Sequence, residues 1–180
     1  VNPAAIENLI GTPFKDTLAG NAANNVLTGA GGQDTIEGGS GQDLIQAGIT
    51  QFVYLDFDSY TVKGKREYTQ GDRDAVQVRL EADFSPFGYK FTQVRPLGGA
   101  FAQILFNKAP FSINGVDQPG GISDELDWRN VNLTGTLSVD VNGFLGYTTK
   151  QIAATSANFV ALSATIAAHE LGHLSGLRHA

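Results

Sequence analysis

The sequence of 180 residues contains no cysteine and no methionine. The absence of cysteine excludes a disulfide framework and every zinc site built on thiolates. No apolar run is long enough to cross a bilayer, so we expect no membrane span. Basic residues are scarce, because 12 lysines and arginines stand against 18 acidic residues and give a net charge of -6. A nucleic-acid partner, which requires a basic surface, is therefore not expected.

Histidine is also rare, and its distribution is uneven. The chain has three histidines, His169, His173 and His179, all close to its C-terminal end. Residues four apart on a helix share one face, so His169 and His173 can bind one metal ion. Gly176 permits a left-handed turn after the helix, which lets His179 return as a third ligand. Three imidazoles with an open fourth position are a donor set of catalytic zinc.

Glu170 stands beside the first of these histidines and supplies a general base. Zinc lowers the pKa of its bound water to roughly 7, and Glu170 can take the proton and pass it to the leaving amine. The stretch from His169 to His179 resembles the His-Glu-x-x-His-x-x-Gly-x-x-His motif of the metzincin zinc peptidases at every fixed position. The resemblance covers about residues 51–180. It implies a zinc-dependent endopeptidase that hydrolyses a protein or peptide substrate, with Glu170 as the catalytic residue and one zinc ion bound by the three histidines.

The metzincin resemblance also implies a fold. In that family the active-site helix lies under a twisted sheet, and the substrate pairs with the edge strand of the sheet across the zinc cleft. We therefore expect an α+β unit with a mixed sheet and two helices, whose edge strand lies between Phe111 and Asp127. Metzincins continue after the third histidine with a second subdomain that contains a methionine turn. Because this chain ends at Ala180 without methionine, we expect residues 51–180 to be the N-terminal part of a catalytic domain, with the C-terminal subdomain missing.

Local patterns in residues 51–180 predict an α/β unit. Asp72 is a candidate cap of a helix that buries Val76 and Leu80. A second helix is expected from about Ser156 to Ser175, with Ser156, Asn158 or Thr149 as its cap. Runs of strand-forming residues lie at 52–57, 90–95, 101–106 and 136–141, whereas 110–127 is rich in loop residues. The acidic residues Asp124, Glu125, Asp127 and Asp140 are interpreted as a solvated loop, with a further calcium site as the alternative.

The region from Gly11 to Gly48 repeats every nine residues. Each unit begins with glycine, and its eighth residue is leucine or isoleucine. This period predicts a coil of short parallel strands, in which glycines form the turns and the aliphatic residues stack. Carboxylates and turn carbonyls are hard oxygen ligands that suit calcium. The sixth residues of the four units are Asp16, Asn25, Asp34 and Asp43.

The repeats resemble the calcium-binding nonapeptide repeats of repeat-in-toxin proteins. In that family two units make one turn of a parallel β-roll, and calcium lies between turns 18 residues apart. The resemblance implies that Asp16 faces Asp34 and that Asn25 faces Asp43. Only the unit 38–46 matches every fixed position, so we expect one or two structural calcium ions. Residues 1–48 are therefore predicted to be a calcium-binding β-roll.

Two functions remain open from the sequence. The first is a secreted, extracellular zinc endopeptidase that is stabilised by calcium-binding repeats. The second is a calcium-dependent extracellular adhesive or surface-layer module with a structural or vestigial zinc site. The two functions are distinguished by the role of Glu170, which an enzyme needs for turnover and a structural module does not.

Overall fold

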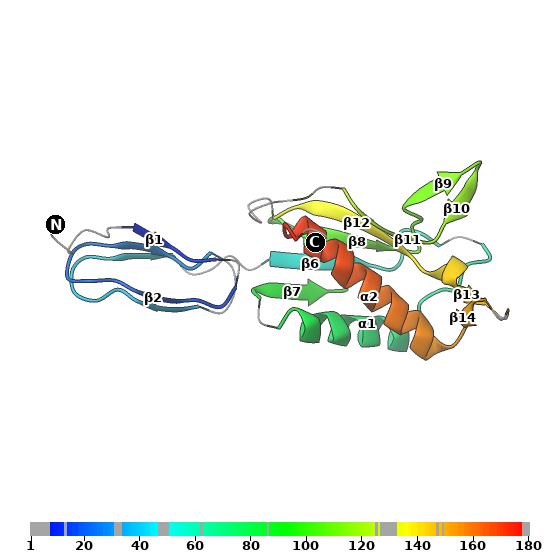
Figure 1. The fold of residues 1–180 in the computed structure, drawn as a ribbon, viewed down its shortest axis with the longest axis horizontal. Helices are drawn as coiled ribbons and strands as arrows, with labels where there is room; N and C mark the ends of the chain where they lie inside the picture. The colour runs from blue at the N-terminus through cyan, green and yellow to red at the C-terminus, as the bar shows by residue number, and fades with distance from the viewer. Residues whose placement is uncertain are drawn as a thin grey trace. The chain divides into compact units, whose positions relative to one another are not determined.

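The computed structural model describes residues 8–12, 14–30, 34–46, 51–61, 63–85, 87–124, 126, 133–146, 148 and 150–177. The chain divides into two compact units, Val1–Gln51 with Phe84–Lys90 and Phe52–Asp83 with Phe91–Ala180 (Figure 1). The described residues form two α-helices and several sheets, so the mixed α/β class is confirmed. None of the described helices is long and apolar enough for a membrane span.

The N-terminal strands form a parallel β-roll, as predicted. One sheet contains β1 (Asn8–Ile10), β3 (Val26–Thr28) and β5 (Leu44–Gln46), and a second contains β2 (Thr17–Ala19) and β4 (Thr35–Glu37). The eighth residues of the units stack in register, because Leu9 pairs with Leu27, Leu27 with Ile45, and Leu18 with Ile36. Partners in each sheet are two units apart in sequence, so two units make one turn of the roll.

Burial in the roll is confined to its middle. Leu18 and Leu27 are 6% and 1% exposed, whereas Ile45 in the last strand is 48% exposed. Strands of three residues bury few side chains, so apolar contacts alone stabilise this unit weakly.

The second unit is built around a five-stranded mixed sheet. Its strands are β6 (Gln51–Asp56), β7 (Tyr89–Thr92), β8 (Ala102–Phe106), β11 (Gly120–Ser123) and β12 (Gly135–Asp140), in the order β11-β12-β8-β6-β7. Strands β6, β8 and β12 are parallel, and β11 runs antiparallel to β12 at the edge. An edge strand therefore lies between Phe111 and Asp127, where the sequence placed it.

The prediction that residues 110–127 are mainly loop was wrong. This segment contains β9 (Phe111–Ile113) and β10 (Val116–Gln118), which form an antiparallel hairpin, as well as β11. Asn114 and Gly115 connect the hairpin with φ angles of 51° and 77°. A pair of residues with positive φ fits the right-handed twist of a two-residue hairpin, and Asn-Gly is its strongest local signal.

The two helices pack against each other, and α2 also packs on β11 and β12. Helix α1 (Gln70–Asp83) buries Val76 and Leu80 completely, as predicted. Its cap is Thr69, however, because the Thr69 hydroxyl accepts a hydrogen bond from the Asp72 amide while the Asp72 carboxylate accepts one from the Thr69 amide. This reciprocal capping box places Asp72 in the first turn instead of at the cap.

Helix α2 (Ser156–Leu174) begins after Thr155, whose hydroxyl accepts a hydrogen bond from the Asn158 amide at 3.2 Å. None of the three predicted caps is therefore the cap of this helix. Ser156 and Asn158 lie inside it, and Thr149 falls outside the described residues.

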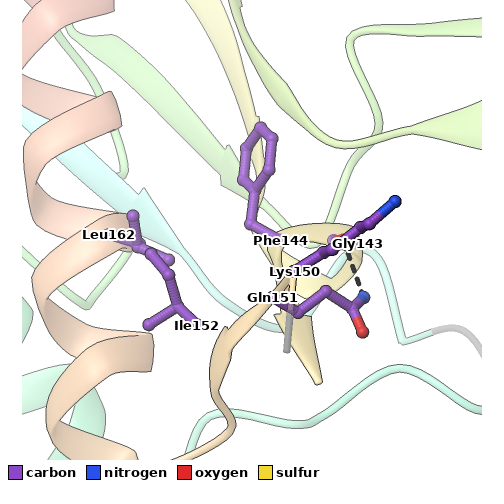
Figure 2. A pocket seen from close by; sticks show the side chains of 6 residues that line it. All are labelled: Gly143, Phe144, Lys150, Gln151, Ile152 and Leu162. Carbon is purple, nitrogen blue, oxygen red and sulfur yellow. Dashed lines mark hydrogen bonds between the residues drawn. The ribbon is translucent and has the colours of Figure 1, made fainter. Parts of the chain in front are cut away.

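The connection from β12 to α2 is held in shape by one glutamine side chain. It consists of η1 (Asn142–Phe144), β13 (Leu145–Gly146) and β14 (Ile152–Ala153). The Gln151 amide nitrogen donates to the Gly143 carbonyl at 3.3 Å (Figure 2). It also donates to the Leu145 carbonyl at 3.3 Å. These bonds tie the short β13–β14 pair back onto η1.

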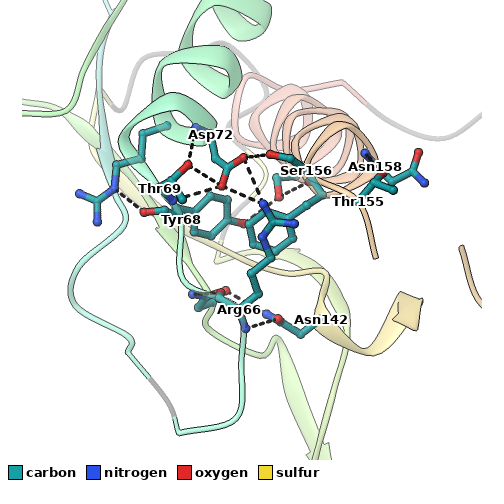
Figure 3. Close-up of polar contacts among 12 residues, drawn as sticks. Arg66, Tyr68, Thr69, Asp72, Asn142, Thr155, Ser156 and Asn158 are labelled. Carbon is teal, nitrogen blue, oxygen red and sulfur yellow. Dashed lines mark hydrogen bonds and ion pairs between the residues drawn. The ribbon is translucent and has the colours of Figure 1, made fainter. Parts of the chain in front are cut away.

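A buried polar network fixes the beginning of both helices (Figure 3). Asp72 is 2% exposed, and its carboxylate accepts hydrogen bonds from Arg66, Thr69 and the Ser156 hydroxyl. The Arg66 amide in turn donates to the side chain of Asn142 at 2.8 Å. One carboxylate therefore joins the first turn of α1 to the first turn of α2 and to η1.

The charge on Asp72 is stabilised by its partners. Burial raises the pKa of this carboxyl, but the hydrogen bonds from Ser156, Thr69 and Arg66 outweigh burial and hold the pKa below its ordinary value. A lowered native pKa contributes stability above the pKa of the unfolded chain, about 3.9, and that stability is lost as the pH falls through the native pKa.

Asp140 belongs to a second buried ion pair. It is 3% exposed, and its carboxylate accepts a hydrogen bond from the Lys65 ammonium at 2.7 Å. The Asp124 carboxylate accepts from the Thr136 amide at 2.9 Å. Both of these carboxylates therefore have protein partners, and Glu125 and Asp127 lie outside the described residues.

We expect Asp72→Asn to lower the free energy of unfolding by about 2 kcal/mol at pH 7, because it leaves a partly buried Arg66 without its counter-charge. The difference from the unmodified chain should shrink as the pH falls below about 4. Urea unfolding at several pH values measures both effects. Asp74→Asn, at an exposed position of the same helix, is the matched control and should have a smaller effect. Equal effects of the two substitutions would contradict the role given to Asp72.

Candidate metal centres

Helix α2 ends in a turn that brings the chain back over its last residues. The Leu177 amide donates to the Gly172 carbonyl and the Gly176 amide to the His173 carbonyl, both at 2.9 Å. Gly176 adopts a φ of 90°, as the sequence predicted. This pair of hydrogen bonds around a left-handed glycine is a Schellman motif.

The turn orients the second histidine. Nδ1 of His173 lies 2.8 Å from the Leu177 carbonyl oxygen. A carbonyl only accepts, so Nδ1 carries the proton, and in the neutral ring Nε2 presents its lone pair. A backbone carbonyl that fixes the imidazole tautomer in this way is the usual support of a metal-binding histidine.

The lone pair of His173 is directed at the first histidine. The Nε2 atoms of His169 and His173 are 3.2 Å apart, and the rings are nearly perpendicular, at 83°. Two nitrogens that bind one tetrahedral zinc at about 2.0–2.1 Å are roughly 3.3 Å apart. The distance between these two nitrogens therefore matches that between two ligands of one zinc ion.

Glu170 lies on the side of α2 that faces the edge strand. It is 9% exposed, and no described residue donates a hydrogen bond to its carboxylate. A Cβ atom placed on Gly121 would lie 2.8 Å from its Oε1 and 2.5 Å from Cγ2 of Ile166. Only glycine at position 121 lets β11 approach the helix this closely. Gly121 is not among the residues predicted from the sequence, although a Gly-Gly pair in a strand signals close packing.

The third predicted ligand, His179, lies outside the described residues. Among the residues that the structure does describe, no group of three His, Cys, Asp or Glu side chains is placed to hold a metal ion. The structure thus brings together His169 and His173, with Glu170 next to the first.

In the roll, the predicted calcium ligands meet in two pairs. The Asp34 carboxylate accepts a hydrogen bond from the Asp16 amide at 3.0 Å, and Asp43 accepts from the Asn25 amide at 2.9 Å. Each hydrogen bond spans 18 residues, so the facing pairs are those that the repeat predicted.

The Asp16–Asp34 pair has an unsatisfied oxygen. Oδ2 of Asp34 is buried, and no described residue donates a hydrogen bond to it. A Cβ atom on Gly11 would lie 2.6 Å from the Gly29 carbonyl and 2.7 Å from Oδ2 of Asp16. The Asp16 carboxylate and the Gly29 carbonyl therefore meet where a glycine leaves room, and the Asp34 carboxylate binds the Asp16 amide. Carboxylate and carbonyl oxygens are donors that suit calcium.

The Asn25–Asp43 pair carries one carboxylate, whereas the Asp16–Asp34 pair carries two, and its side-chain oxygens accept hydrogen bonds from backbone amides. Asn25 is 1% exposed, and its side-chain oxygen accepts a hydrogen bond from the Asn21 amide at 2.8 Å. The Asn24 side chain accepts from the Gln42 amide at 2.9 Å. Amide side chains thus bond this pair of turns together, and Asp43 brings its one carboxylate.

The comparisons agree with the repeats. Residues 10–45 match the RTX calcium-binding nonapeptide repeat, in 4 copies. Comparison with curated proteins found no match, and comparison with solved structures also found none. The chain therefore carries RTX repeats, and calcium is the cofactor that these repeats support.

We expect Gly176→Ala to weaken zinc binding about 10- to 100-fold, because the strained turn would move the Leu177 carbonyl away from His173. Titration with a chromogenic zinc chelator measures the change. Gly99→Ala is the matched control, since Gly99 has a similar φ of 82° but no neighbour within 4 Å. Equal zinc affinity of the two variants would show that the turn does not support the site.

We expect Asp34→Asn to lower calcium affinity and Asn25→Asp to raise it, because calcium affinity follows the number of charged ligands. Isothermal titration calorimetry with calcium measures both changes. Glu37→Gln, on strand β4 and outside the turns, should leave the affinity unchanged. If Asp34→Asn binds calcium as the unmodified chain does, the Asp16–Asp34 pair is not a calcium site.

Proposed function

We propose that the chain is part of a secreted zinc-dependent endopeptidase whose catalytic unit follows a calcium-binding RTX roll. The observation that carries the proposal is the His169–His173 pair, whose Nε2 atoms are 3.2 Å apart and whose second ring is oriented by a carbonyl. This separation is close to that of two nitrogens on one tetrahedral zinc, and the same two residues are the first two histidines of the motif.

The resemblance of His169–His179 to the metzincin motif supports the same function. It requires His179 as the third zinc ligand and Glu170 as the general base. The edge strand also agrees, because β11 lies beside Glu170 and pairs only with β12 among the described residues. An extended substrate can add to the other side of such a strand by main-chain hydrogen bonds.

The roles of the side chains follow from their positions. Bound zinc supplies Lewis acidity, which polarises the scissile carbonyl and makes a water more acidic. The Glu170 carboxylate accepts a proton from the attacking water and returns it to the nitrogen of the leaving amine. Because no described residue donates to this carboxylate, both of its oxygens are available for that proton.

Calcium acts on the roll and not on the reaction. A ligand that binds only the folded state stabilises it in proportion to the logarithm of its concentration. RTX repeats are typical of secreted proteins. In a compartment poor in calcium, the buried Oδ2 of Asp34 has no partner among the described residues, and outside the cell calcium can bind it. We therefore place the folded, active form outside the cell.

We expect Glu170→Ala to reduce peptide-bond hydrolysis about 10²- to 10⁴-fold while zinc stays bound, because general acid–base catalysis contributes that much. The assay is casein hydrolysis by the longest natural chain that contains residues 1–180, with zinc measured by atomic absorption. Glu81→Ala, on the exposed face of α1, is the control and should retain full activity.

Two results would overturn the endopeptidase. Equal hydrolysis by Glu170→Ala and the unmodified chain would remove Glu170 from the reaction. Zinc bound by both, with no hydrolysis of any protein substrate, would favour the calcium-dependent adhesive or surface-layer module with a structural zinc site.

A further inference from the structure

A cavity of about 370 Å³ lies beside the N-terminal half of α2. Its lining is mostly apolar, with Phe144 and Ile152 on the β12–α2 connection and Leu162 on the helix (Figure 2). Phe144 and Ile152 are 39% and 46% exposed, so the cavity opens to solvent. The remaining lining residues are Gly143, Lys150 and Gln151.

Hydrogen bonds connect the residues that form the wall of this cavity. Gln151 donates hydrogen bonds to the Gly143 and Leu145 carbonyls and accepts one from the Thr148 hydroxyl at 3.0 Å. Leu145 and Ile152 are paired in the β13–β14 ladder. A cavity with a defined wall can select the size of the group that enters it.

The cavity lies on the same face of α2 as the histidines. Leu162 precedes His169 by seven residues and His173 by eleven. At 100° per residue, both histidines are within about 20° of Leu162 around the helix. The rise along the axis places Leu162 about 10 Å from His169.

The edge strand links the cavity to Glu170. Pro119, which precedes β11, packs against Gly143 of the cavity wall, because a Cβ on Gly143 would lie 2.7 Å from its Cγ. Gly121, two residues later, packs against Ile166 and Glu170. The chain direction of β11 is therefore from the cavity towards Glu170.

We propose that the cavity binds an apolar side chain of the substrate, two or three residues on the C-terminal side of the scissile bond. This inference rests on the endopeptidase proposed above. A peptide antiparallel to β11 runs from Glu170 towards Pro119, so its C-terminal part reaches the cavity. The two contacts of this strand, at Pro119 and Gly121, are two residues apart, whereas the rise of about 10 Å along α2 equals about three residues of extended chain. The apolar lining favours leucine or phenylalanine over polar side chains.

Cleavage of a random peptide mixture by the longest natural chain tests the proposal. We expect enrichment of leucine and phenylalanine at the second or third position after the cleaved bond. Ile152→Trp should fill the cavity and lower kcat/KM for peptides with these residues at least tenfold, but change it little for the same peptides with glycine there. Leu162→Ala should enlarge the cavity and shift the preference towards aromatic side chains. Val78→Trp, at an exposed position of α1, should leave the profile unchanged.

A binding measurement separates this proposal from the endopeptidase itself. The probes are fluorescein-labelled alanine-rich decapeptides that carry one leucine, or serine in its place, and the protein is the Glu170→Ala chain. Stronger binding of the leucine peptides, lost with Ile152→Trp, supports the cavity even if no peptide is cleaved. The cavity proposal is overturned if no residue is preferred at either of the two positions, or if the leucine and serine peptides bind equally. The endopeptidase proposal is then still tested by its own assay, the casein hydrolysis.

Discussion

The packing of α2 against the sheet is the constraint on which the candidate active site depends. One face of the helix is fully buried, and several of its members are small, so the helix lies close to β11 and β12. The buried residues of this face include Phe159, Ser163, Ala164, Ala167, Leu171 and Leu174. Once this face is committed to the core, the rotation of the helix is fixed. His169 then points to solvent and Glu170 lies at the margin, against Gly121.

Both ends of α2 are held by specific bonds. At the start, the hydroxyl of Ser156 donates a hydrogen bond to the buried Asp72 carboxylate. The same carboxylate accepts hydrogen bonds from the Arg66 side chain and from the amide of Thr69, the cap of α1. At the end, the turn at Gly176 returns the Leu177 carbonyl to His173. These bonds fix where α2 begins and ends, and the bond at its end also orients the His173 ring.

The roll obeys a different physical rule. Its strands are three residues long, and of their described apolar residues Leu18 and Leu27 are deeply buried, so hydrophobic burial contributes little to its stability. Its turns instead collect oxygen atoms, with Oδ2 of Asp34 left unsatisfied on one side and asparagine amides bonded across the other. An unsatisfied buried carboxylate oxygen is costly unless a cation binds it, so we expect bound calcium to stabilise the folded roll.

The sequence by itself determined the features that depend on spacing along one chain. The nine-residue period specified the parallel roll and its facing pairs, and the helical spacing placed His169 and His173 on one face. Gly176 marked the end of the helix because only a left-handed residue allows that turn. Local signals are weaker where several neighbouring residues can play the same role, so Thr69 and Thr155 are the caps in place of the predicted residues. The Asn114–Gly115 turn also occurs in a segment rich in loop residues, so the sequence did not predict its hairpin.

Only the tertiary structure decided which residues from distant segments meet. Gly121 comes to Glu170, Asp72 to Ser156, and the β12–α2 connection to Leu162, and no local pattern encodes these contacts. The physical reason is that helical and strand periods report which face of an element is buried, but not which partner buries it. That partner is set by the order of strands in the sheet and by the close approach that small residues allow.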